Sequence, residues 1–133
     1  MWQRAVNGSG GGLSEITLWE NPNPSATQTS LTPSWSGKDI DDYKYIGFLF
    51  KSATTTSVDA TANIWIYTTP EKLKQSLTST NANCLIAGTT VTSGFYYRQI
   101  TYASDSSVNI SAAVGNGGNN QYYCIPVKIV GLS

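Results

Sequence analysis

Apolar and polar side chains alternate with a period of two along most of this 133-residue chain. In the segment 45–51, Ile46, Phe48 and Phe50 fall on one face of an extended strand. Because alternate side chains of a strand point to opposite sides, this face is expected to point into the core. The same period recurs in the segments 64–67, 95–102, 108–114 and 125–129.

Two of these segments carry aromatic rings, and the rings are distributed differently over their two faces. In the segment 64–67, Ile64 and Ile66 share one face, and Trp65 and Tyr67 share the other. We therefore expect the two rings to lie on the side opposite to the isoleucines. Both faces of the segment 95–102 carry rings, with Phe95 and Tyr97 on one, and Tyr96, Arg98, Ile100 and Tyr102 on the other.

The connecting segments are rich in Gly, Asn, Pro and Ser, which suit turns. Helical spacing occurs only in the segment 70–77, where Pro70 suits the first helical position and Leu73 and Leu77 are four residues apart. Seven or eight short strands joined by such turns predict an all-β fold. We expect an antiparallel two-sheet sandwich with jelly-roll topology and at most one short helix.

The first residues differ from the remainder of the chain. Residues 7–12 read Asn-Gly-Ser-Gly-Gly-Gly, a composition that cannot offset ordering entropy by burial. Residues 1–13 are therefore predicted to be a flexible Gly/Ser-rich linker, in which Trp2 is either the end of an upstream domain or packs back onto the body. Residues 14–133 are enough for one core and too few for two, so we expect one β-sandwich domain.

The composition is nearly neutral. Eight basic and eight acidic residues cancel, and only 12% of residues are charged. Nucleic acid is not expected as a partner, because phosphate binding requires clustered Lys and Arg. No apolar stretch approaches the roughly 20 residues of a membrane span, so no membrane insertion is expected, and the start lacks the apolar segment of a signal peptide.

The chain lacks histidine and has two cysteines, Cys84 and Cys124. Histidine-dependent catalysis is excluded, and two cysteines are too few for a zinc site. The carboxylates fall mostly in turns or at element ends, so we expect no enzyme, no cofactor and no metal. The two cysteines are expected to be buried free thiols, although a disulfide stays open. The acidic segment 39–42 is interpreted as a solvated turn and not as a calcium loop.

The aromatic residues carry the remaining functional signal. Flat rings beside amide groups are typical of sugar-binding sites, although strands also favour Tyr and Trp for packing, and subunit contact is an alternative use. Trp19 and Trp35 are assigned to the core or to an interface. The candidate ligand-binding residues are Trp65, Tyr67, Tyr96, Arg98, Asn119, Asn120 and Tyr122.

The two ends of the chain carry motifs. Near the start stands Leu18-Trp19-Glu20-Asn21-Pro22, and near the end Ile125-Pro126-Val127-Lys128-Ile129-Val130-Gly131. Together with the strand 43–50 and the Arg98-Gln99-Ile100 step, they resemble the C-terminal β-sandwich module of phage and prophage tail proteins, of the baseplate or tail fibre. The resemblance spans residues 17–132. Its motif residues define the fold, so no binding site transfers, and Pro126 is expected at an edge or a bulge.

The resemblance implies a component of the virion tail, made in the host cytoplasm, that contacts other tail subunits and the host surface. It also implies a homo-oligomer, for which we expect a trimer. The expected function is a receptor-binding module that recognises host cell-surface saccharide. A structural or oligomerisation domain of a tail protein, and a carbohydrate-binding module of a larger bacterial protein, are the alternatives.

Overall fold

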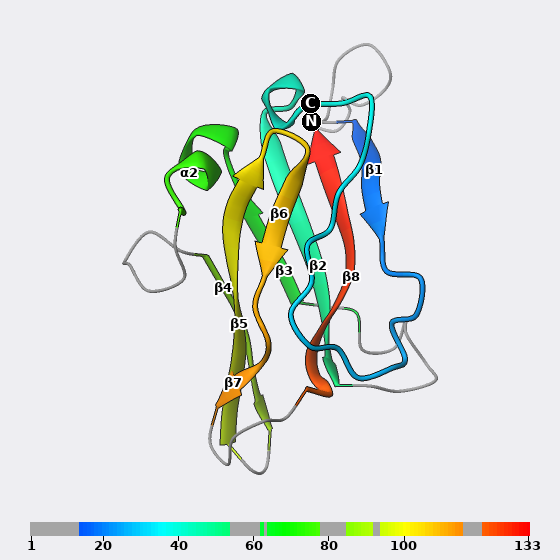
Figure 1. The fold of residues 1–133 in the computed structure, drawn as a ribbon, viewed down its shortest axis with the longest axis vertical. Coiled ribbons are helices and arrows are strands. Elements are labelled where there is room, and N and C mark those ends of the chain that lie inside the picture. The colour runs from blue at the N-terminus through cyan, green and yellow to red at the C-terminus, as the bar shows by residue number, and fades with distance from the viewer. Residues whose placement is uncertain (1–13, 54–61, 63, 78–84, 92–93, 116–120) are drawn as a thin grey trace, which may run out of the picture.

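The chain forms two antiparallel β-sheets that face each other, as Figure 1 shows for the computed structural model. The structure describes residues 14–53, 62, 64–77, 85–91, 94–115 and 121–133. One sheet has the strand order β1-β8-β2-β3, and the other has the order β4-β5-β6, with β7 paired to β5. The predicted all-β sandwich is confirmed. The strands are β1 (Glu15–Glu20), β2 (Tyr45–Ala53), β3 (Ile64–Thr68), β4 (Leu85–Val91), β5 (Gly94–Ser104), β6 (Ser107–Ile110), β7 (Val114–Gly115) and β8 (Tyr123–Leu132).

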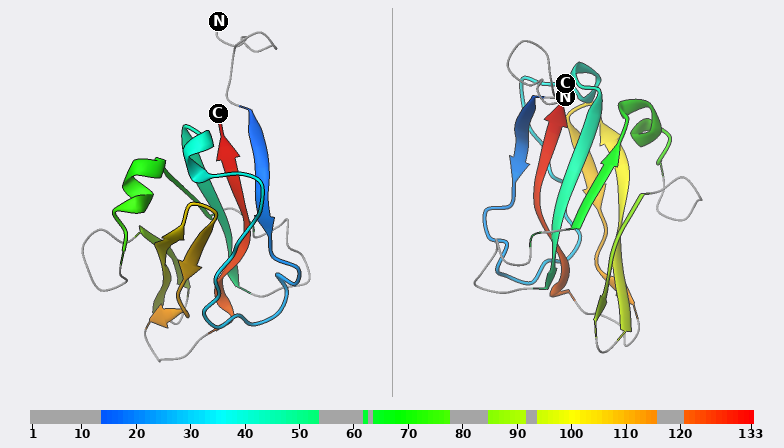
Figure 2. Two further views of the ribbon diagram at one scale, coloured as in Figure 1. Left: turned by 45° about the horizontal axis from the view of Figure 1, so that its top comes forward. Right: turned by 180° about the vertical axis from the view of Figure 1, so that it is seen from behind.

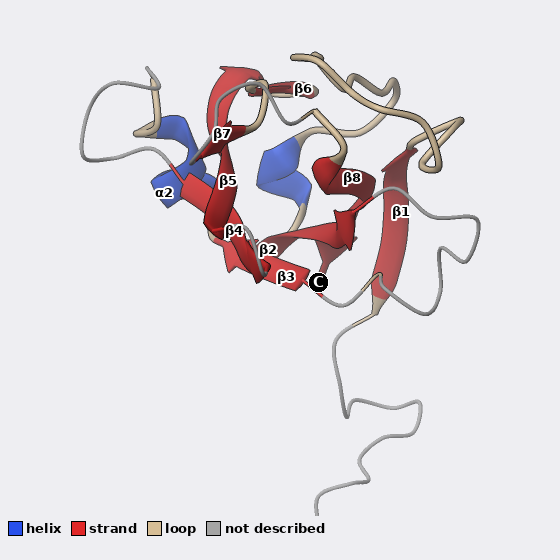
Figure 3. Cartoon of the chain, turned by 90° about the horizontal axis from the view of Figure 1, so that it is seen from below, coloured by secondary structure: helices blue, strands red, loops and turns tan. Residues whose placement is uncertain are grey.

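The topology brings early and late segments together. β8 lies between β1 and β2, and β6 forms bridges to Leu31 and Ser34 of the segment after β1. The first part of the chain thus lies against the last, whereas β2 with β3 and β4 with β5 pair as sequence neighbours. The jelly-roll topology stays a prediction. Figure 2 and Figure 3 show β3 and β4 side by side along one edge of the sandwich, and the segment 21–39 across the opposite edge.

The core lies between the sheets, where the alternation places it. Ile46, Phe48 and Phe50 of β2 are at most 1% exposed, which confirms the predicted inward face. Ile100 of β5 and Ile110 of β6 meet them from the other sheet. The outward-facing residues of β2 have the opposite parity, so the β3 residues paired with them also face outward.

Two short helical segments cap one end of the sandwich. The predicted helix is confirmed as α2 (Pro70–Lys74), where the Thr69 hydroxyl accepts a hydrogen bond from the Lys72 N–H at 3.2 Å. The helix stops before Leu77, which is 63% exposed while Leu73 is buried, so the two leucines do not share a helix face. The acidic turn forms a 3₁₀ helix (Ile40–Asp42). The Asp42 carboxylate accepts a hydrogen bond from the Asp39 N–H, which stands just before this helix.

The two end motifs meet in space. The Asn21 side-chain amide donates to the Pro126 carbonyl at 2.8 Å, and its oxygen accepts from the Asn23 N–H at 2.9 Å. The Asn21 N–H donates to the Val127 carbonyl at 2.8 Å, just beyond the last β1–β8 pair. The register of β8 against β2 shifts at Val127, so Pro126 adjoins a bulge, as predicted. The motifs therefore close the first strand onto the last.

Candidate functional site

Arg98, a predicted ligand contact, is fully buried in β5. Its guanidinium makes five hydrogen bonds of 2.8–3.2 Å, and every acceptor is a backbone carbonyl. Burial lowers the pKa of Arg98 to about 10, which still leaves it charged near neutral pH. Arg98 thus joins three separate segments to β5 and does not face solvent. The accepting carbonyls belong to Gln28, Thr29, Ser111, Gln121 and Tyr123.

Two of the predicted ligand-binding tyrosines, Tyr96 and Tyr122, both pack on Tyr123 and form a column of three rings with it. Tyr96 is 2% exposed and stacks on Tyr123 with centroids 4.2 Å apart. Tyr122 packs on the same Tyr123 ring at 4.4 Å and is 40% exposed. Of the three rings, Tyr122 is exposed, Tyr123 is half-buried and Tyr96 is closed to a ligand. The predicted contacts Asn119 and Asn120 lie outside the described residues.

Trp65 and Tyr67 lie on the outer face of β3, the edge strand of its sheet. Their rings stack with centroids 5.4 Å apart and planes within 6° of parallel. Tyr67 is 54% exposed. Gly47 of β2 makes room for this ring, because a Cβ there would lie 2.9 Å from the Tyr67 Cε1 atom. The pair is therefore a preformed aromatic surface, and it lies on the face opposite to Ile64 and Ile66, as the alternation predicted.

A similar pair lies on the outer face of the opposite sheet. Phe95 and Tyr97 of β5 stack with centroids 5.8 Å apart, and Phe95 is 47% exposed. The Phe95 ring crosses Gly88 of β4, where a Cβ would lie 2.6 Å from its Cζ atom. Two further apolar residues are exposed beside this pair: Val114 of β7 pairs with Tyr97, and Ile86 of β4 pairs with Gln99.

Next to this pair, the outer face of β5 and β6 is hollowed into a groove of about 470 Å³. The sequence did not reveal it, because hydroxyl and amide residues are common in turns and strands of any β-sandwich. The one available signal was the Gln99 and Thr101 pair, which continues the Phe95 and Tyr97 face as a polar stretch. The polar lining consists of Ser30, Thr32, Gln99, Thr101, Asn109 and Ser111.

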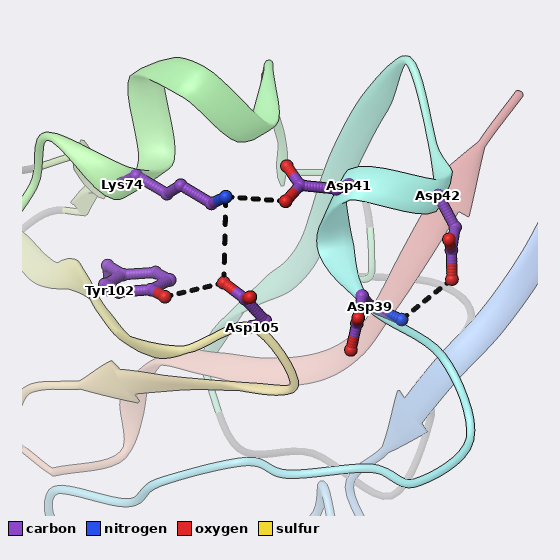
Figure 4. Close-up of polar contacts among 6 residues, drawn as sticks. All are labelled: Asp39, Asp41, Asp42, Lys74, Tyr102 and Asp105. Atoms are coloured by element: carbon purple, nitrogen blue, oxygen red, sulfur yellow. Dashed lines mark hydrogen bonds and ion pairs between the residues drawn. The ribbon is translucent and has the colours of Figure 1, made fainter.

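The acidic turn forms an ion-pair cluster at the end of the sandwich (Figure 4). The Lys74 ammonium lies 2.6 Å from Asp41 and 3.7 Å from Asp105, and the Tyr102 hydroxyl donates to Asp105 at 2.6 Å. The hydrogen bond to Asp41 raises the pKa of Lys74, and the bond to Asp105 raises the pKa of Tyr102. This cluster ties α2 to two turns and lies in solvent, which accords with the expected solvated turn.

Cys124 is a free, fully buried thiol, as predicted, whereas Cys84 lies outside the described residues. Its Sγ donates to the Tyr96 carbonyl at 3.3 Å, and burial raises the pKa of the thiol from 9.0 to about 11. The unfolded chain releases this proton near pH 9 while the folded chain keeps it. The thiol therefore stabilises the fold below pH 9, and this contribution is lost as the pH rises toward 11.

We expect the free energy of unfolding to fall more steeply between pH 9 and 11 in the wild type than in a Cys124→Ala variant. Urea denaturation at several pH values measures both slopes, and the comparison cancels the titration of other groups. Parallel slopes would show that the Cys124 thiolate costs nothing in the folded chain.

Comparison of the chain with protein-family models, with curated proteins and with solved structures finds no match in any of the three. In the described part of the chain, no group of three or more Cys, Asp or Glu side chains is placed to hold a metal ion. No helix among the described residues is long and apolar enough to cross a membrane. The stacked ring pairs and the groove are therefore the candidate binding surfaces among the described residues.

Proposed function

We propose that this chain is a receptor-binding module of a phage tail that recognises saccharide on the host cell surface. The observation that carries the saccharide part is the parallel Trp65 and Tyr67 pair, in which Trp65 is half-buried and Tyr67 is exposed over Gly47. Sugar rings have apolar faces that pack on aromatic rings, and a preformed surface loses little conformational entropy on binding.

The resemblance of the two end motifs to tail-protein modules supports the tail part of the proposal. In the fold these motifs are joined through Asn21 and Pro126, and Val130 of the second motif lies beside Gly47, across from Tyr67. They therefore act on the stability of the domain. A tail tip of this kind presents the module in several copies, so weak single sites add up through multivalency.

A glycan array and pull-down on bacterial envelopes test the proposal. We expect saturable binding that falls about fivefold to tenfold in Trp65→Ala and in Tyr67→Ala, because each loses a ring contact of about 1–1.5 kcal/mol. Gly47→Ala keeps both rings but displaces Tyr67, since the new Cβ would lie 2.9 Å from its ring, and is expected to weaken binding as well.

The matched control is Ile16→Ala, because Ile16 is also exposed, at 41%, on β1 at the other edge of the same sheet. This control should bind like the wild type. Sedimentation of every variant separates ligand binding from assembly. Loss of an oligomer in the Trp65 and Tyr67 variants, without any saccharide signal in the wild type, would instead assign the rings to subunit contact.

A further inference from the structure

The groove on the outer face of β5 and β6 lies on the sheet opposite to Trp65 and Tyr67. Three segments build its walls: residues 30–32, the chain at Leu77 after α2, and the strands themselves. A volume of about 470 Å³ falls within the range of roughly 300–1,000 Å³ that small-molecule sites occupy. The groove is therefore large enough for one or two sugar units.

The walls are held before any ligand arrives. The backbone of Leu31 exchanges two hydrogen bonds of 2.9 Å with Ile110, and the Ser111 hydroxyl accepts from the Gln99 N–H at 2.9 Å. Beneath the groove, the Arg98 guanidinium binds the carbonyls of Thr29 and Ser111, on either side of it. Arg98 is thus a positioning residue for this groove and not a ligand contact.

The chemistry of the lining selects an uncharged ligand. Every residue that lines the groove is uncharged, and the polar ones carry hydroxyl or amide groups. A charged ligand would lose hydration here without gaining a counter-charge, which costs several kcal/mol. A polyol replaces its bonds to water with bonds to hydroxyls and amides, so its transfer into the groove is nearly neutral in free energy.

Two polar groups in the groove retain bonding capacity. The Thr101 side chain lines the groove and the residue is only 6% exposed, yet its hydroxyl makes no hydrogen bond within the part of the chain that the structure describes. The Thr32 hydroxyl donates to the Asn109 Oδ1 atom at 2.9 Å, and this bond leaves the Asn109 amide N–H groups as donors. A buried hydroxyl beside a fixed amide suits a ligand hydroxyl that both donates and accepts.

Apolar contacts flank these polar groups. Leu77, 63% exposed, lines the groove, and the stacked Phe95 and Tyr97 rings continue the same face of β5 beyond Gln99. Polar groups between apolar surfaces match the mixed faces of a pyranose ring. We propose that the groove is a second saccharide site, which binds an uncharged sugar unit. This proposal deepens the proposed function and rests on it, because it names the ligand class at a separate site.

Amide NMR of the isotope-labelled chain tests the proposal with neutral sugars (glucose, galactose, mannose, N-acetylglucosamine) and acidic sugars (glucuronic acid, N-acetylneuraminic acid) as probes. We expect a neutral sugar to shift the signals of Gln99, Thr101 and Asn109, and acidic sugars to leave them in place. Thr101→Val preserves the shape of the side chain and removes only the hydroxyl. It is expected to weaken the neutral-sugar affinity about tenfold, as loss of one hydrogen bond to a ligand does.

Thr90→Val is the matched control, since Thr90 is exposed on β4 of the same sheet and does not line the groove. It should bind like the wild type, and thermal melting should show both variants folded. Neutral sugars that leave the groove signals unchanged, acidic sugars that bind as tightly, or an unaltered affinity in Thr101→Val would each overturn the proposal. Shifts confined to the Trp65 indole would overturn the second site alone and leave the proposed function standing.

Discussion

Replacing Arg98 with methionine is expected to destabilise the domain by about 3–5 kcal/mol, a large fraction of the roughly 5–15 kcal/mol that stabilises a typical domain. Methionine fills similar space but removes the side-chain donor of five partly buried carbonyls, of which only that of Gln121 keeps a further donor, the Gln28 N–H, among the hydrogen bonds of the loops and turns. Each such loss costs roughly 1–3 kcal/mol, whereas relief of the guanidinium's desolvation returns several kcal/mol once. Several hydrogen bonds to carbonyls are lost, whereas the desolvation of one guanidinium is relieved once. The variant is therefore expected to be less stable than the wild type.

Arg98→Lys separates charge from geometry. An ammonium keeps the charge but has three donors on one atom, so it cannot span carbonyls that come from three segments. We expect most of the loss to remain. The control is Lys128→Met, which removes a surface ion pair with Glu15 at 3.7 Å and should change stability by less than about 1 kcal/mol.

Urea denaturation followed by tryptophan fluorescence measures these differences. An Arg98→Met variant within about 1 kcal/mol of the wild type would contradict the assigned role, because the carbonyls would then have other partners. If the variant folds partly, the Gln28, Ser111 and Gln121 segments should show the largest loss of hydrogen-exchange protection, since these are the segments that Arg98 holds.

The inward face of β2 could be predicted because Ile46, Phe48 and Phe50 recur at every second position within the segment 45–51. The inward face of β5 could not, since both of its faces carry rings and the deciding contacts come from distant segments. Arg98 finds its acceptors about 13 to 70 residues away, and each is a backbone carbonyl. Any residue supplies a carbonyl, so the sequence contains no trace of the partners of Arg98.

The same reasoning explains why the Trp65 and Tyr67 pair could be predicted from the sequence, whereas the groove could not. Trp65 and Tyr67 were located because Ile64 and Ile66 mark the opposite face within the same short strand. The groove depends on the meeting of residues 30–32 with β5 and β6, a contact between segments that the sequence separates by about 70 residues or more. Local alternation predicts which way a side chain points, and only the folded topology brings such side chains together.

Asn21→Ala is expected to cost about 2–3 kcal/mol of the free energy of unfolding, because Asn21 is 9% exposed and makes two side-chain hydrogen bonds. Its loss removes the side-chain donor of the buried Pro126 carbonyl and the side-chain acceptor of the Asn23 N–H. The control is Asn23→Ala, since Asn23 is exposed and takes part in the turn through its backbone. Urea denaturation should separate the two variants clearly.

Asn21→Asp separates the effects of the two side-chain hydrogen bonds of Asn21. The introduced carboxylate still accepts from the Asn23 N–H, but it faces the Pro126 carbonyl at the position where the amide donated at 2.8 Å. Its ionised form is therefore disfavoured in the fold, and its pKa should lie above the ordinary value of about 4. The protonated carboxyl can donate to Pro126, so the deficit against the wild type should be smallest below about pH 4 and grow as the pH rises through the raised pKa. A deficit independent of pH would show that Asn21 acts only through the turn to Asn23, and that the junction of the first and last strands depends on backbone pairing alone.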